Sequence, residues 1–144
     1  MSPSVSKQEF KAAQQGKTAL VVDDVEDMLD LLEIALNCAQ FSVLRASSIP
    51  EALALFEEHA VEIDLLMTEV RVGSDNGLDL AKRLRTAKPS LQILAISAFS
   101  RDRKAVNVDK GIAFLPKPFS ASELRKKLDT LFPEARFNPD SSTS

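Results

Sequence analysis

The residues of this sequence best suited to chemistry follow short apolar runs, at the points where strands would end. Asp23 and Asp24 follow the first run, and Glu69 closes the third. Ser97 ends the fourth run, and Lys117 comes just after the fifth. A few hard oxygen ligands completed by water suit Mg²⁺, and a serine donor with a lysine charge suits a tetrahedral oxyanion such as a phosphoryl group. These residues therefore predict a magnesium and phosphate site, provided that the fold brings them together.

Each of these acidic residues also has a simpler interpretation. An aspartate after a strand commonly caps the following helix by accepting hydrogen bonds from its first free N–H groups. Capping alone does not explain why polar residues stand at four strand ends of one chain. Close carboxylates repel one another and stay ionised only beside a compensating cation, so the combined pattern favours a functional site.

The rest of the chain predicts how these residues are positioned. Short apolar runs typical of buried strands alternate with longer runs whose apolar residues recur at helical spacing. Two Ser-x-x-Glu pairs, Ser48 with Glu51 and Ser120 with Glu123, have the pattern of capping boxes at helix starts. The expected strands are 19–22, 41–44, 64–69, 91–97 and 112–115, and the expected helices are 25–39, 48–56, 78–84, 101–110 and 120–131.

This alternation predicts an α/β fold, a single doubly wound five-stranded parallel sheet with five helices on its two faces and right-handed crossovers. Ligands bind such sheets beyond the carboxyl ends of the strands. The five polar residues are expected at that edge.

Length and composition limit the class of protein. The chain has 144 residues, 44% of them hydrophobic, and a net charge of −3, which fits one domain and argues against a strongly basic nucleic-acid binder. No apolar run approaches the roughly 20 residues that span a membrane.

The single cysteine, Cys38, indicates a reducing cytoplasm, and we expect it to be buried in its helix. The polar ends, 1–17 and 133–144, predict flexible tails around a domain at 18–132.

At this point the sequence resembles a family, the receiver domain of bacterial response regulators, over Thr18 to Phe132. The resemblance implies a flavodoxin-like sheet with strand order 2-1-3-4-5. Five motifs carry it in this order: Val21-Val22-Asp23-Asp24, Asp64-Leu65-Leu66-Met67-Thr68-Glu69, Asn76-Gly77-Leu78, Ile93-Leu94-Ala95-Ile96-Ser97-Ala98 and Phe114-Leu115-Pro116-Lys117-Pro118-Phe119.

The resemblance assigns a role to each motif. Mg²⁺ would be held by the acidic pair, by the acceptor carboxylate at Glu69 and by the backbone carbonyl of Arg71. The acceptor would receive phosphate from a histidine kinase, Ser97 would follow the phosphoryl group, and Lys117 would pair with it. Phe114 stands at the aromatic switch position, and the Lys117-Pro118 bond would be cis.

The chain departs from this family most clearly at the acceptor, where Glu69 stands in place of aspartate. The extra methylene moves the carboxylate by up to about 1.5 Å, one C–C bond, and an error near 1 Å in the placement of a reacting group can lower a rate roughly a hundredfold. We therefore hypothesise that Glu69 is a poor phosphoacceptor that partly imitates a phosphorylated aspartate. Arg71 either pairs with Asp23 or Asp24 and substitutes for Mg²⁺, or is a solvated loop residue.

These expectations combine into a function. The chain is predicted to be a stand-alone, cytoplasmic receiver, a monomer or weak homodimer, that acts through contacts with a histidine kinase, a phosphotransfer protein or a downstream protein, and not with nucleic acid or membrane. It would be no enzyme beyond phosphoryl transfer to itself. A second interpretation keeps Mg²⁺-dependent self-phosphorylation, and a third is a flavodoxin-like binder of a small anion.

Overall fold

The structure is a computed structural model that describes residues 16–97 and 111–133. None of the helices in these two ranges has the length and apolar character needed to cross a bilayer. In chain order, the elements are β1 (Thr18–Val22), α2 (Glu26–Cys38), β2 (Ser42–Ala46), α3 (Ile49–His59), β3 (Leu65–Glu69), β4 (Arg71–Val72), β5 (Asp75–Asn76), α4 (Gly77–Ala87), β6 (Gln92–Ser97), β7 (Ile112–Pro116) and α6 (Ala121–Leu131).

Five of these strands form one parallel sheet in the order β2-β1-β3-β6-β7. This confirms the predicted flavodoxin-like sheet and its 2-1-3-4-5 order. The central strands are apolar along almost their whole length because helices cover both of their faces. All five residues of β1 are buried, whereas the edge strand β2 has only one buried residue.

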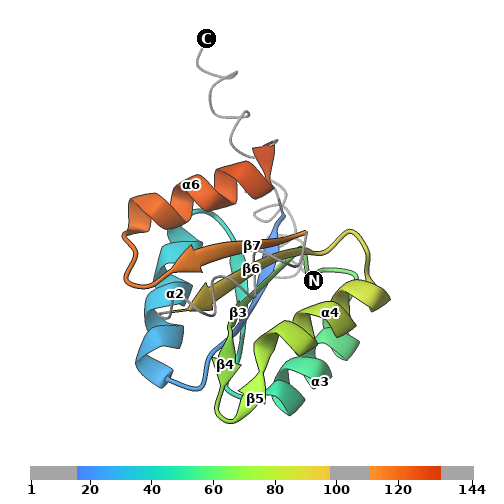
Figure 1. Ribbon diagram of the computed structural model, residues 1–144. Coiled ribbons are helices and arrows are strands. Elements are labelled where there is room, and N and C mark those ends of the chain that lie inside the picture. The colour runs from blue at the N-terminus through green and yellow to red at the C-terminus, as the bar shows by residue number, and fades with distance from the viewer. Residues whose placement is uncertain (1–15, 98–110, 134–144) are drawn as a thin grey trace, which may run out of the picture.

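Helices α2 and α6 cover one face of the sheet, and α3 and α4 cover the other (Figure 1). Successive residues of a strand point to opposite faces, so β1 contributes to both cores. Ala19 and Val21 pack with α2 and α6, whereas Leu20 and Val22 pack with α3 and α4.

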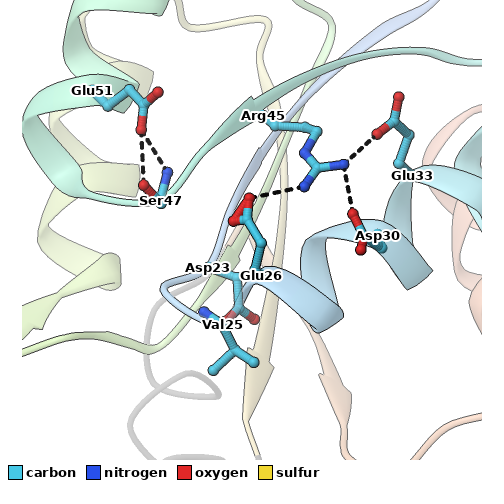
Figure 2. Close-up of polar contacts among 8 residues, drawn as sticks. All are labelled: Asp23, Val25, Glu26, Asp30, Glu33, Arg45, Ser47 and Glu51. Atoms are coloured by element: carbon cyan, nitrogen blue, oxygen red, sulfur yellow. Dashed lines mark hydrogen bonds and ion pairs between the residues drawn. The ribbon is translucent and has the colours of Figure 1, made fainter.

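The predicted helix starts are found with one local difference. Ser120 and Glu123 form a complete capping box at the start of α6. At the start of α3, Ser48 Oγ accepts from the Glu51 N–H at 3.2 Å, but the Glu51 carboxylate accepts from the N–H and hydroxyl of Ser47 (Figure 2). In a capping box the Glu51 carboxylate would accept from the N–H of Ser48. Here it accepts from Ser47, one residue earlier, because the Ser47 hydroxyl supplies an additional donor.

Other expectations are corrected or lie outside the described residues. The stretch between Glu69 and α4 contains the antiparallel β4–β5 pair, which is not among the expected strands. The prediction that Cys38 is buried is wrong, because the residue lies on the outer side of α2 and is exposed.

Four helices are described, and the fifth, expected at 101–110, lies outside the described residues. The expected tails also lie almost wholly outside them, and the Lys117-Pro118 bond is cis as the resemblance implied.

Candidate functional site

The carboxyl edge of the sheet brings the predicted site residues close in space. Glu69 is the last residue of β3, and its register partner in β6 is Ile96, next to Ser97. Lys117 follows β7, and its N–H donates to the Ser97 carbonyl at 2.9 Å. Asp23 follows β1, and its N–H donates to a β2 carbonyl at 3.1 Å. Hydrogen bonds between neighbouring strands therefore fix the backbone positions from which these side chains extend.

Glu69 and Lys117 form an ion pair at the centre of this edge. Their Oε1 and Nζ atoms are 3.0 Å apart, and the two side chains are 15% and 22% exposed. Charges interact more strongly where water is partly excluded, so this pair joins the ends of β3 and β7. One oxygen of the carboxylate at the predicted acceptor position already has a cationic partner.

The Asp23 carboxylate has one oxygen hydrogen-bonded at the start of α2 and one oxygen without a hydrogen-bond partner. Its side chain is almost completely buried, at 1% exposure. Oδ1 accepts from the Val25 N–H at 2.9 Å, just before α2 begins (Figure 2). Oδ2 is buried and has no hydrogen-bond partner. The capping interpretation accounts for one oxygen of this carboxylate and leaves the other for a further partner.

The charges at this edge act on one another. Burial raises the pKa of Asp23, while the hydrogen bond from Val25 and the charge of Lys117 oppose that rise. Burial also raises the pKa of Glu69, and its pairing with Lys117 opposes it. The charge of Asp24 raises the pKa of both carboxyl groups. These four residues therefore form one electrostatic cluster.

The described side chains do not form a preassembled magnesium site. No group of three or more Asp, Glu, His or Cys side chains in the described ranges is placed to hold a metal ion. Asp24 is exposed, whereas Asp23 is buried and Glu69 is paired with Lys117. A magnesium site at this edge therefore stays a prediction, with buried Asp23 and partly buried Glu69 among its predicted ligands.

Arg71 takes no part in this electrostatic cluster. It lies in β4, is exposed, and forms no ion pair with any described carboxylate. The hypothesised pairing of its guanidinium with Asp23 or Asp24 is therefore not formed among the described residues. Its backbone carbonyl remains a predicted metal ligand.

The two predicted switch residues are buried behind the ion pair. Ser97 is 1% exposed at the end of β6. Phe114, in β7, is 8% exposed and packs in a small cluster with Val70, Leu78 and Ala95. Phe114 is the register partner of Ala95, two residues before Ser97.

Sequence reasoning missed the residue that fixes the backbone at Glu69. A Cβ on Gly77 would clash with the Glu69 carbonyl oxygen and with Thr68 Oγ1. The Gly77 N–H donates to the Val70 carbonyl at 2.7 Å, and the Thr68 hydroxyl donates to the Glu69 carbonyl at 2.9 Å. The pair Asn76-Gly77 indicated a helix start, and Asn76 does cap α4, but no sequence signal revealed the close approach to β3.

Comparison with known proteins identifies the family. The sequence model of the response regulator receiver domain matches residues 19–129. The chain belongs to the response regulator receiver domain family. It is thus a receiver of the kind found in two-component response regulators, as the motifs implied.

The receiver is similar to parts of larger signalling proteins. It is 33% identical to the alginate biosynthesis transcriptional regulatory protein AlgB of Pseudomonas aeruginosa, over 81% of this chain and 26% of that protein. It is 34% identical to the sensor kinase CckA of Brucella abortus, over 74% of this chain and 12% of that protein. The chain therefore spans about a quarter and about an eighth of these two relatives.

Solved structures share the receiver fold. A response regulator receiver domain from Clostridium thermocellum superposes with a TM-score of 0.74 at 23% identity, covering 84% of this chain and 98% of that one. The receiver domain of the hybrid histidine kinase CckA gives 0.65 at 29% identity, covering 79% and 97%. These likenesses agree with the sheet order and place the ion pair at the carboxyl edge of a receiver fold.

Proposed function

We propose that this receiver works in a two-component pathway through protein–protein contacts, with Glu69 as an unphosphorylated occupant of the acceptor position. The observation that carries the proposal is the 3.0 Å ion pair between Glu69 Oε1 and Lys117 Nζ. The lysine that would neutralise an arriving phosphoryl group already neutralises a carboxylate. In the unphosphorylated protein, the Glu69 carboxylate thus occupies the position beside Lys117 that a phosphoryl group would take.

The ion pair also explains why Glu69 would be a poor nucleophile. In-line attack needs a free carboxylate oxygen within about 3–3.5 Å of phosphorus. Lys117 holds Oε1, so Oε2 would have to attack, and the side chain would have to withdraw by the length of its extra methylene. Gly77 and Thr68 hold the Glu69 backbone in place, so the main chain cannot easily retreat to compensate.

The same contact biases the conformation of the receiver. By joining the ends of β3 and β7, the pair holds together two strand ends that a phosphoryl group would otherwise bridge. A carboxylate has fewer acceptor oxygens and less charge than a phosphoryl group. The bias is therefore partial, and the protein functions as an adaptor rather than as a fully activated regulator.

A self-phosphorylating receiver is the second candidate, favoured by the unpartnered Oδ2 of Asp23. In that reaction a Glu69 oxygen would form a bond to phosphorus while the bond to the leaving group of the donor breaks, leaving an acyl phosphate. Mg²⁺ would neutralise charge on the transferring group when bound. The absence of a three-ligand group among the described residues argues against it.

A small-anion binder is a weaker candidate. Asp23, Asp24 and Glu69 place negative charge at the edge where such a ligand would bind, and this charge repels an anion. Of the two cationic residues predicted at the site, Lys117 is already paired with Glu69, and Arg71 lies exposed in β4 and is not part of the electrostatic cluster.

The names of the receiver's relatives support a proposal about its partners. The sensor kinase CckA and the autoinducer 1 sensor kinase/phosphatase LuxN of Vibrio harveyi both contain regions similar to this chain. We propose a histidine kinase or a phosphotransfer protein as upstream partner, a protein as downstream partner, and the cytoplasm as the place of action.

The experiment that tests the proposal is phosphorylation by acetyl phosphate, followed by intact-mass measurement. We expect no gain of mass in the native chain, with or without Mg²⁺. We expect Glu69→Asp to gain one phosphoryl group in the presence of Mg²⁺, because the shorter side chain frees the space in front of Lys117. Glu69→Gln, which has no carboxylate, is the matched control and should stay unlabelled.

Two results would contradict the proposal. Stoichiometric labelling of the native chain at Glu69 would support the self-phosphorylating candidate. Failure of Glu69→Asp to label, while the variant remains folded by circular dichroism, would show that side-chain length is not what prevents the reaction.

A further inference from the structure

Helix α4 connects the two opposite edges of the sheet. It follows β3, which ends in Glu69 at the carboxyl edge, and it leads back to the start of β6 at the other edge (Figure 1). Its first residue, Gly77, lies against the Glu69 carbonyl, and the Gly77 N–H donates to the Val70 carbonyl at 2.7 Å. The start of this helix therefore contacts the strand end that carries Glu69.

Arg85, in the last turn of α4, joins the starts of β6 and β7. Its Nη2 atom donates to the carbonyl of Leu91 at 2.9 Å and to the carbonyl of Gly111 at 2.7 Å. Leu91 is the residue before β6, and Gly111 is the residue before β7. A single nitrogen atom therefore fixes how the starts of these two strands lie relative to each other.

The backbone at Gly111 is suited to this contact. Its φ of +94° lies in the region that favours glycine. A Cβ at this position would clash with Nη1 of Arg85. Glycine therefore allows the start of β7 to approach the guanidinium closely.

The placement of Arg85 leaves one of its donors without a partner. Nε is buried and forms no hydrogen bond in the described part of the chain. A buried donor without a partner costs free energy, and such a group in a folded protein requires an explanation. The two bonds from Nη2 supply one, because they hold the guanidinium where it reaches both strand starts.

The two strands lead from Arg85 to the predicted site residues. Their register pairs Ile93 with Ile112 near Arg85 and Ser97 with Pro116 at the carboxyl edge. Lys117 follows directly, and its N–H donates to the Ser97 carbonyl at 2.9 Å. A shift of β7 along β6 would displace all of its residues together, so it would also displace Lys117.

We propose that Arg85 is a positioning residue for the ion pair between Glu69 and Lys117. By holding the start of β7 against the start of β6, it sets the place of Lys117 at the other end of the strand. Gly77, at the start of the same helix, holds the backbone of Glu69. The proposal rests on the proposed function, in which this ion pair occupies the acceptor site.

A double-mutant cycle tests whether Arg85 and the ion pair act together. Urea denaturation gives the equilibrium constant for unfolding of the native full chain, Arg85→Met, Glu69→Gln and the double variant. Effects of distant, independent sites combine in this constant to within roughly a factor of two. We expect Glu69→Gln to raise the constant by a factor about threefold smaller in the Arg85→Met background, because the ion pair is already weakened there.

Arg45→Met is the matched control for this cycle. Arg45 joins β2 to α2 through Glu26, Asp30 and Glu33, and it contacts neither β6 nor β7 in these printed ion pairs (Figure 2). The control therefore removes an arginine, with its charge, from another junction of strand and helix. Its effect should combine with that of Glu69→Gln as the effects of independent sites do.

NMR spectroscopy tests the same role without denaturation. We expect the backbone amide resonance of Lys117 to shift in Arg85→Met and to stay in place in Arg45→Met. Arg85→Lys is the milder variant, for use where Arg85→Met does not fold. Lysine keeps the charge but ends one bond short of the Nη2 position, so the same shift and the same coupling are expected.

Two results would overturn the positioning role of Arg85. One is a cycle in which the Arg85 variant and Glu69→Gln act independently. The other is a Lys117 amide resonance that does not move in a folded Arg85 variant. Neither measurement uses phosphorylation, so labelling of native Glu69 by acetyl phosphate would count against the proposed function and not against the role of Arg85.

Discussion

At the scale of single residues, the site shows two ways of keeping a buried carboxylate. Glu69 has an ammonium group 3.0 Å away, and this charge opposes the rise in pKa that burial causes. Asp23 has one backbone N–H and an oxygen without a partner, so its burial is offset less. Functional sites often retain such costly groups because their chemistry needs them.

Asp23 should therefore make the protein less stable at neutral pH than an uncharged residue would. Its pKa is raised from 3.8 in the folded state, so the folded protein binds the proton more tightly and loses stability as pH rises through that window. Asp23→Asn keeps an acceptor for Val25. We expect it to raise the free energy of unfolding at pH 7, because the neutral amide avoids the cost of burying a carboxylate.

Urea denaturation at pH 7 and at acid pH measures this effect. The gain should disappear near pH 3, where the carboxyl group is protonated in both states. Asp24→Asn, at the exposed neighbouring position, should change stability little. A loss of stability in Asp23→Asn at pH 7 would mean that the charge is compensated by a partner.

At the scale of elements, two basic side chains at the C-terminal end of α4 donate hydrogen bonds to backbone carbonyls of neighbouring segments. Lys88 Nζ donates to the carbonyls of Ala60 and Ile63 at 2.8 and 2.6 Å, just after α3 ends. Arg85 donates to the carbonyls of Leu91 and Gly111 at 2.9 and 2.7 Å. The last carbonyls of a helix and the residues beyond it lack helical partners, so these contacts fix how α3, α4 and β7 meet.

Lys88→Met should lower the free energy of unfolding by about 1.5–3 kcal/mol, the usual range for hydrogen bonds to a charged group. Methionine keeps the length of the side chain but cannot donate to the carbonyls of Ala60 and Ile63. Thermal or urea denaturation measures the loss. Lys127→Met, on α6 at the other face of the sheet, is the control, and an equal loss in both variants would contradict a specific role for Lys88.

At the scale of the whole molecule, the sheet is unevenly protected. β1 and β3 lie between other strands and under helices on both faces, and their residues are almost all buried. β2 is an edge strand, and four of its five residues are only partly buried. Stability against local opening follows burial and contact density.

Hydrogen exchange followed by mass spectrometry should therefore show a gradient across the sheet. Amides of β1, β3 and β6 should exchange most slowly, and peptides from β2 should exchange measurably faster. Equal protection in β1 and β2 would contradict this gradient and would indicate that the edge is covered by a partner.

Much of this architecture was predictable because its signals are local. The apolar runs of the strands, the helical spacing of residues such as Leu29, Leu32 and Leu36, and the Ser120 capping box each depend on a few neighbouring residues. The family could be recognised from the order of its motifs. The burial of Cys38 was misjudged because apolar composition alone does not tell which side of a helix faces the core.

The amino-acid sequence by itself determined which polar residues stand at the strand ends, since that depends only on where each apolar run stops. Only the tertiary structure decided how they meet: that Lys117 reaches Glu69, that Asp24 turns to solvent while Asp23 is buried, and that Gly77 must lack a side chain. These facts are distances between residues far apart along the chain. Such distances depend on how strands and helices pack, which no local pattern records.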